Sequence, residues 1–453
     1  MTLQWLILLP LASSVLLFLI GPRQRLLVSL VGLVTLLTNT RVVQNLPLHL
    51  TTRLWGQQWM LDELGQALLL YAYAATALLI VIAFFADQAG GFAPPAVAHC
   101  GLLSAVVLLR AAPLSFLLYA SALLLCALTV RPGSPEAARG AARWLIAAAL
   151  PVMCVPLAVA LQQGDVTLPG QLTAADVGSW LVWLLLLSWW TLFPLDGTTR
   201  LWSKDRLAVG ALFLWTVKDW TVLYLWLRLW QQYPALQAES PMAGLGIAGL
   251  ATAVFSGVWA FVQSEPSGVL ACAAMSALGI AVQGLTAGAG PAVQGGLVVL
   301  ATRSLATWLS GAALAAWPLA AARDAASEVN APRWRKPLVF GAFAIGILAL
   351  AGLPPWGGLT AQGQILPWLA AEQPYVRLAW LSGSLGIVLG LVRCAWPLWH
   401  SEAGPSADPR ADLPLLLVAA LLVLMLWVGL QPQSVAGWLA RLFGKLFPAL
   451  TGG

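Results

Sequence analysis

The sequence predicts an all-α fold, that of a polytopic integral membrane protein with about fourteen transmembrane helices. The 453 residues are 60% hydrophobic and only 9% charged, and their mean hydropathy is +0.84. Soluble domains carry about 25% charged residues. Apolar runs long enough to cross the hydrocarbon core recur almost from end to end. Most of the 23 Lys and Arg residues fall between these runs.

The expected spans begin with a run that no basic residue precedes and that Arg23 and Arg25 follow. A cleaved signal peptide carries its positive charge in front, so we expect a retained helix with its N-terminus outside. In chain order the fourteen spans are 3–20, 25–43, 63–86, 95–110, 113–130, 139–161, 177–200, 207–230, 240–262, 268–286, 294–316, 337–370, 376–399 and 413–431.

Two of these spans contain helix-breaking residues. The twelfth is too long for one straight crossing and is interrupted at Pro354, Pro355, Gly357 and Gly358, and the seventh is interrupted at Pro194. Irregular backbone at membrane depth persists only inside protein or beside a wet cavity, and broken helices commonly mark an ion or substrate path. We therefore expect helices seven and twelve to be broken.

Loop charge sets the expected orientation. With the N-terminus outside, thirteen Lys and Arg residues fall in the inner loops and seven on the outer side. This bias follows the positive-inside rule. It predicts a multi-pass protein of a cell membrane, here the bacterial inner membrane, with both termini outside.

The chain end differs from the rest, so we expect a transmembrane domain over 1–433 and a short amphipathic segment over 434–453. At helical spacing the segment places one apolar set opposite Arg441 and Lys445: Trp438, Leu439, Leu442, Phe443 and Leu446. Such a helix either lies in the membrane interface or packs on a neighbour, and the sequence leaves both open.

Cofactor motifs are missing from the sequence. The five cysteines stand singly, and the three histidines are far apart, so we expect no metal site. There is no phosphate-binding loop, dinucleotide fingerprint, haem motif or iron–sulfur motif, so we expect no cofactor and assign any redox reaction to partner proteins. Basic residues do not cluster on an aqueous face, which excludes nucleic acid as a partner.

Six segments share their order and spacing with a known family. They are WMLDELGQALLLYAYAATALLIVIAFFAD, LSFLLYASALLL, WTLFPLDGTTRLW, AFVQSEPSGVLACAAMSALGIAVQGL, GGLVVLATRSLATWLSG and LAGLPP. They resemble the antiporter-like membrane subunits of respiratory complex I, a family that includes subunits of Mrp antiporters, group 4 membrane hydrogenases and bicarbonate-accumulating complexes. The resemblance implies antiporter-like inverted repeats and other membrane subunits as partners. It also implies a complex that moves protons or other monovalent ions, in which this chain is at most a non-redox subunit of an NADH-quinone oxidoreductase-like translocase.

The resemblance also implies charged residues along the membrane midplane: Glu in helix five, Lys in helices seven and eight, His in helix eleven, and Lys or Glu in helix twelve. This sequence departs from the family at all five positions. In the same order, helices five, seven, eight, eleven and twelve have Ala120, Trp189, Trp220, Arg303 and Gln362 there. Asp196 replaces the His that follows the helix-seven proline. An indole has one N–H donor and no acceptor, so it cannot relay a proton. We expect the family's path to be blocked here.

Some charge remains inside the spans. Lys218 and Asp219 lie near the middle of span eight, and Lys218 is two residues from Trp220, about 200° around a helix. Either the alignment shifts by two residues or Lys218 faces another side. Lys218 is then a relocated proton site or a buried charge paired with a neighbour such as Asp196. Arg303 cannot lose its proton, so we expect it to pair with Asp196 or Asp219.

Three functions compete. The missing Glu and Lys residues favour a degenerate antiporter-like subunit with a structural or assembly role. An active subunit would move protons along Lys218, Asp219 and Asp196. A membrane transferase for lipid-linked substrates would need an exposed carboxylate in a long outer loop, and the candidates stand in short loops: Asp62, Glu63, Asp165 and Asp176.

Overall fold

The computed structural model describes the chain in segments, and all statements below concern these residues. They are 2–21, 23–49, 51–54, 56–127, 154–163, 174–192, 209–233, 239–287, 290–321, 334–353, 363, 365, 367, 374–400 and 412–444. The described residues up to Gly244 form one compact unit, and those from Leu245 onward form a second.

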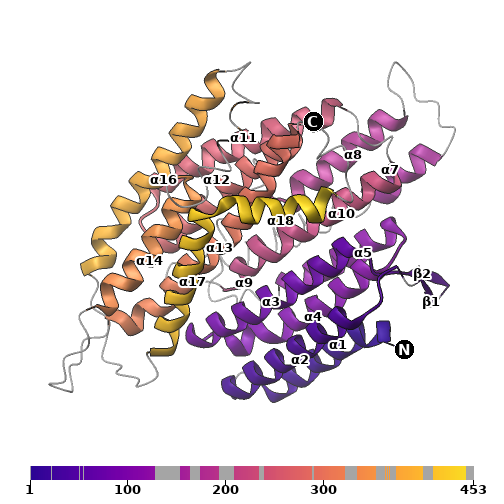
Figure 1. Cartoon of the computed structure of the whole chain (residues 1–453), viewed down its shortest axis with the longest axis horizontal. Coiled ribbons are helices and arrows are strands. Elements are labelled where there is room, and N and C mark those ends of the chain that lie inside the picture. The colour runs from indigo at the N-terminus through magenta and orange to yellow at the C-terminus, as the bar shows by residue number, and fades with distance from the viewer. Residues whose placement is uncertain are drawn as a thin grey trace. The chain divides into compact units, whose positions relative to one another are not determined.

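The first unit is built from helices that run side by side (Figure 1). Its elements are α1 (Thr2–Ile20), α2 (Arg25–Asn45), α3 (Glu63–Phe85), α4 (Ala89–Leu108), α5 (Ala112–Ala127), α7 (Cys154–Gln163), α8 (Ala174–Trp189), α9 (Val209–Phe213), a π-helical turn (Leu214–Lys218, hereafter the π-turn) and α10 (Asp219–Gln232). Helix α4 is buried along most of its length and contacts α1, α2, α3 and α5. Between α3 and α4 the hydroxyls of Tyr73 and Ser104 lie 2.6 Å apart.

The loop before α3 folds into a small antiparallel hairpin of β1 (Thr52–Leu54) and β2 (Gln57–Trp59). Gly56 has φ of +76°, a backbone conformation that glycine adopts without a steric penalty. Backbone bonds from Met60 N to Leu108 O and from Arg110 N to Gln58 O attach the hairpin to the end of α4. This hairpin is a local addition to the helical fold that the sequence predicts.

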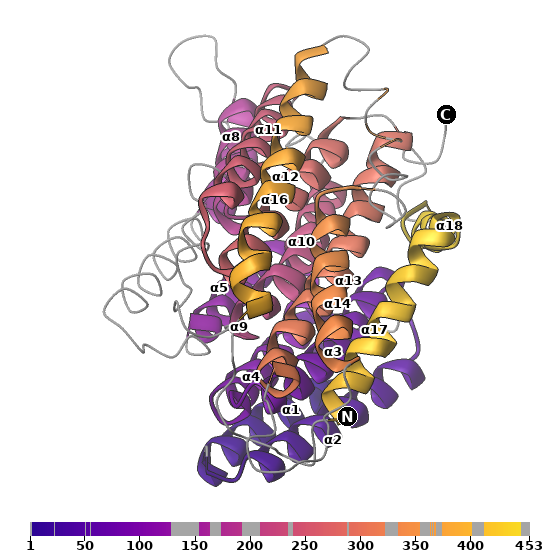
Figure 2. The same cartoon turned by 90° about the vertical axis from the view of Figure 1, so that its left-hand side faces the viewer.

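The second unit contains the remaining helices: α11 (Glu239–Val262, whose first residues belong to the first unit), α12 (Pro266–Thr286), α13 (Gly290–Ala321), α14 (Arg335–Leu350), α16 (Pro374–His400), α17 (Asp412–Leu430) and α18 (Pro432–Gly444). Helix α12 is almost wholly buried and contacts α13, α14 and α16. Its Gln283 accepts a hydrogen bond of 2.7 Å from the Trp380 indole of α16. Figure 2 shows α12, α13, α14 and α16 side by side.

Helix α18 lies crosswise to α17 in both views (Figures 1 and 2) and contacts α13 and α17. Its Leu439 and Phe443 side chains are buried, whereas Trp438 and Arg441 are exposed. Part of the predicted apolar set therefore packs on its own chain, whereas the Trp438 indole, which the sequence places in that set, is exposed like Arg441.

Membrane crossing follows from length and composition. Within the described ranges nine helices are long and apolar enough to span a bilayer: α1, α2, α3, α4, α11, α12, α13, α16 and α17. Their outward side chains include Phe18 and Leu19, both about three-quarters exposed. The chain is a multi-pass membrane protein. The number fourteen stays a prediction, because parts of spans five, six, seven, eight and twelve lie outside the described residues.

Helix α4 begins earlier than expected. The sequence places this span at 95–110, after Pro94 and Pro95, but the helix starts at Ala89 and runs through both prolines. Each proline lacks the N–H that would bond the carbonyl four residues earlier. The Pro94 carbonyl accepts a bond of 2.8 Å from the Ser14 hydroxyl of α1, which holds this part of α4 against α1.

Candidate buried charge site

Lys218 and Asp219 form an ion pair inside the first unit. Lys218 ends the π-turn and Asp219 begins α10, and the Nζ–Oδ1 distance is 3.1 Å. The two side chains are 2% and 1% exposed. Lys218 Nζ also donates a hydrogen bond of 2.6 Å to the carbonyl oxygen of Trp189. Two opposite charges thus lie together where both side chains are almost wholly shielded from solvent.

The π-turn shapes the backbone around this pair. A π-helical turn widens the hydrogen-bonding ring by one residue, and such turns are frequent at functional sites. Two tyrosines from neighbouring helices donate to its carbonyls: Tyr71 of α3 to Thr216 O at 3.4 Å, and Tyr119 of α5 to Lys218 O at 3.3 Å. Side chains of α3 and α5 thus hold the turn that carries Lys218.

Trp189 closes the other side of the site. It is the last residue of α8, where backbone carbonyls lack partners within the helix, so Lys218 acts as a cationic cap on this helix end. The Trp189 indole is buried and stacks on Phe116 of α5, with 5.4 Å between ring centroids and 19° between planes. It also meets the Tyr119 ring edge-on at 5.2 Å. The contact between α5 and α8 is therefore aromatic.

Trp220 faces a different neighbour from Lys218. Its ring lies 5.7 Å from the ring of Tyr71 on α3, and the residue is half-buried, whereas Lys218 reaches Trp189 on α8. Ala120 is buried in α5, beside Tyr119 in sequence. Of the predicted site residues in the first unit, the structure brings Lys218, Asp219 and Trp189 together.

Arg303 lies in the second unit, on α13. It is 2% exposed, and its Nε donates a hydrogen bond of 2.7 Å to the Ala274 carbonyl of α12. The sequence predicts an acidic partner for this guanidinium, Asp196 or Asp219. The carboxylate of Asp219 is paired with Lys218, and Asp196 lies outside the described residues.

For both predicted helix breaks, the structure describes the helix that leads into the break but not the break itself. Helix α8 ends at Trp189, and Thr191 has φ of +53°; helix α14 ends at Leu350, and Gly352 has φ of +77°. Both helices thus end just before the predicted interruptions. The remaining residues of these predictions fall outside the described ranges: Pro194, Pro354, Pro355, Gly357, Gly358 and Gln362.

The chain is similar to known membrane proteins in part of its sequence and in its helical fold. Residues 207–390, which include Lys218, Asp219 and Arg303, match the family described as NADH:quinone oxidoreductase/Mrp antiporter, TM. This match covers less than half of the chain, and over these residues the chain resembles the antiporter-like family. Solved structures agree with this chain in fold over nearly its whole length.

Three of these structures show the extent of the likeness. A chain of respiratory complex I from Thermus thermophilus with bound NADH is 19% identical, with 100% of both chains covered and a TM-score of 0.73. A chain of the Mrp complex from Dietzia sp. DQ12-45-1b is 17% identical, with 99% of each covered and a TM-score of 0.75. A chain of the membrane-bound sulfane sulfur reductase, an archaeal respiratory membrane complex, is 15% identical, covering 95% of this chain and 76% of that one, with a TM-score of 0.69.

Two buried groups were not singled out from the sequence. Arg228 of α10 donates to the Val106 and Val107 carbonyls at the end of α4 and to the Tyr224 hydroxyl, at 3.1–3.3 Å. His99 of α4 contacts the Ala122 carbonyl of α5 through Nδ1 at 2.9 Å. Because a carbonyl oxygen only accepts, Nδ1 carries the proton. Backbone carbonyl partners such as these leave no pattern in a sequence, and the histidines were considered there only for metal spacing.

Two of the other acidic candidates stabilise the starts of helices. Asp62 is the N-cap of α3, and its Oδ1 accepts a hydrogen bond of 2.6 Å from Gly65 N. Asp176 lies in the first turn of α8, where a negative charge is favoured by the helix dipole. Among the described residues no three His, Cys, Asp or Glu side chains gather as a metal site.

Proposed function

We propose that this chain is a membrane subunit of a multi-subunit complex that moves protons or other monovalent ions, and that its own role is structural. The similar chains with solved structures are parts of complex I, an Mrp complex and a sulfane sulfur reductase complex, which supports a complex as its setting. A complex I-like assembly, an Mrp-type assembly, a membrane hydrogenase and a bicarbonate system remain alternatives. In this proposal the protein lies in the bacterial inner membrane with both termini outside.

The aromatic contact of Trp189 carries the structural part of the proposal. The resemblance puts a Glu of helix five and a Lys of helix seven here, and this chain has Ala120 and Trp189. The indole is buried against Phe116 and Tyr119, so it occupies space that an ammonium group and its waters would need. An indole cannot accept a proton from a neighbour. The substitution therefore removes a proton carrier and fills its place.

The contacts of Lys218 support the same conclusion. Its ammonium group neutralises Asp219 and caps the end of α8, so both buried charges have local structural partners. Arg228 makes the same kind of contact at the end of α4. A cation on the π-turn and one on α10 thus stabilise the ends of two neighbouring helices, which is a sufficient reason for a membrane protein to keep them.

One observation favours the active alternative. Lys218 and Asp219 stand at a π-turn with the Tyr119 hydroxyl beside them, an arrangement that a relocated proton path through Asp196 would also use. The alternatives differ in what removal of the pair does. A structural pair affects assembly, and a conducting pair affects proton movement in an assembled complex.

Co-purification tests the proposed setting. We expect the affinity-tagged chain, extracted in mild detergent from its native membrane, to bring down several other multi-pass subunits identifiable by mass spectrometry. A tagged copy of an unrelated multi-pass protein of similar abundance is the control. A monodisperse single chain whose function persists in cells lacking those subunits would contradict the proposal.

A further inference from the structure

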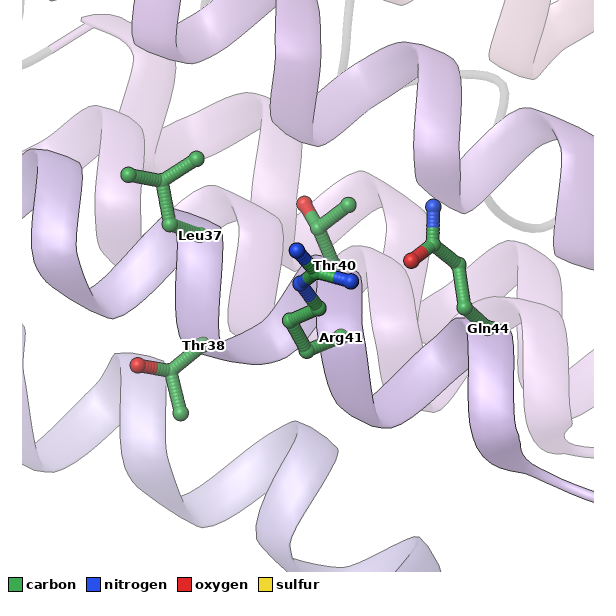
Figure 3. A pocket seen from close by; sticks show the side chains of 5 residues that line it. All are labelled: Leu37, Thr38, Thr40, Arg41 and Gln44. Carbon is green, nitrogen blue, oxygen red and sulfur yellow. The ribbon is translucent and has the colours of Figure 1, made fainter.

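A shallow depression lies on the outer face of α2, near the end of that helix. It has a volume of about 550 Å³ and is lined by Leu37, Thr38, Thr40, Arg41 and Gln44. Figure 3 shows Thr40, Arg41 and Gln44 following one another along the helix, with Leu37 on the neighbouring turn. Neither the family positions nor the buried charge site includes any of these residues.

The donors of this depression suit an anion. Arg41 is exposed, and within the described part of the chain its guanidinium has no hydrogen-bond or ion-pair partner, nor has the Gln44 amide. The hydroxyls of Thr38 and Thr40 donate to Val34 O and Leu36 O of their own helix, so their oxygens can only accept. The free donors are thus a guanidinium fork and an amide, and a guanidinium binds phosphate oxygens in a bidentate manner.

The helix face beside the depression suits an acyl chain. Leu30, Val34 and Leu37 lie one turn apart on α2 and are 50%, 61% and 61% exposed. They lead from the depression toward the middle of the helix. Arg41 stands four residues, or about 6 Å, before the helix end at Asn45, which is within reach of the headgroup layer for a long side chain. The polar donors therefore lie where a lipid headgroup would be, and the apolar stripe lies where its acyl chain would run.

We propose that this face of α2 binds a net-anionic phospholipid, with Arg41 and Gln44 on its phosphate and Leu30, Val34 and Leu37 along an acyl chain. No carboxylate lines the depression among the described residues, so a choline or ethanolamine cation finds no counter-charge there. The inference needs only the multi-pass membrane fold and is independent of whether the chain conducts protons.

Lipid titration of the detergent-purified complex tests the proposal. Phosphatidylglycerol adducts are counted by native mass spectrometry, and phosphatidylcholine and inorganic phosphate are titrated in parallel. Because a basic residue near the surface of an anionic membrane contributes about 1 kcal/mol, Arg41→Gln should weaken the tightest phosphatidylglycerol site about fivefold. Arg53→Gln, which removes an exposed cation from the hairpin, is the matched control and should leave that site unchanged.

Three outcomes would overturn the proposal. One is equal phosphatidylglycerol binding by the Arg41→Gln and Arg53→Gln proteins. A second is equal affinity of the unmodified protein for phosphatidylcholine, or saturation by inorganic phosphate alone. A third is loss of a partner subunit from the Arg41→Gln complex with lipid binding intact, which would make the face a protein contact. Because Arg41 is exposed, the variant should keep the unmodified thermal unfolding midpoint, and this is checked first.

Discussion

Inside the helix bundle Lys218 contacts the carboxylate of Asp219 and the carbonyl oxygen of Trp189. Removing one member of a buried ion pair leaves an uncompensated charge in a low-dielectric interior, whereas removing both does not. If removing Lys218 alone lowers the free energy of unfolding more than removing both charges does, the main role of Lys218 is to neutralise Asp219.

Lys218→Ala should lower the free energy of unfolding by about 3–5 kcal/mol, because the Asp219 carboxylate loses its counter-charge. The double variant Lys218→Met with Asp219→Leu replaces both charges with apolar side chains and should cost less. The measurement is denaturant or thermal unfolding of the purified protein in detergent. A double variant as damaged as the single one would show that the pair is not a closed unit.

Trp189 and Trp220 offer a comparison within one residue type. Trp189 is buried on Phe116 and Tyr119, and Trp220 is half-buried beside Tyr71. Trp189→Ala should cost about 3–5 kcal/mol of unfolding free energy, because a large buried side chain leaves a cavity. Trp220→Ala should cost clearly less. Equal losses would argue against a special packing role for the indole between α5 and α8.

At the scale of elements, the sequence predicts the long helices well. Hydropathy and length alone indicate spans 63–86 and 268–286, and the structure has α3 at Glu63–Phe85 and α12 at Pro266–Thr286. The π-turn was not predicted, because a turn widened by one residue has no compositional signature. The early start of α4 was missed because Pro94 and Pro95 normally end or begin a helix.

Of the candidate site, the sequence predicts the two charged residues but not the groups that surround them. Lys218 and Asp219 are conspicuous in an apolar run, so the sequence identifies them directly. Their surroundings depend on the Trp189 carbonyl and on Tyr119 of α5, and a backbone acceptor 29 residues away along the chain leaves no trace in a sequence. The same reason explains why the carbonyl partners of Arg228 and His99 were not foreseen.

The start of α3 supplies a test at this scale. Asp62→Ala removes the N-cap acceptor of Gly65 N and should destabilise the protein by about 1 kcal/mol. Asp62→Asn keeps an acceptor oxygen and should retain most of that stability. Faster hydrogen exchange in the first turn of α3 in the Ala variant alone would report the local cause. An Ala variant with unchanged exchange and stability would show that the cap contributes nothing.

At the scale of the whole molecule, the loop charges predict that the segments around Arg139 and Lys336 lie on the inner side. Single cysteines introduced there into a cysteine-free chain should react with a membrane-impermeant reagent only after the membrane is opened. A cysteine beside Arg53, in the hairpin, should react in intact cells. Labelling of the first two positions from outside would reverse the proposed topology.

Proton movement decides between a structural and a conducting subunit. The measurement is proton uptake by vesicles that hold the whole complex, normalised to the amount assembled, for the unmodified chain and for Lys218→Met with Asp219→Leu. That variant removes both charges without stranding either one. A structural role predicts the same uptake per assembled complex. Loss of uptake at normal complex yield would contradict it and make Lys218 and Asp219 part of a proton path.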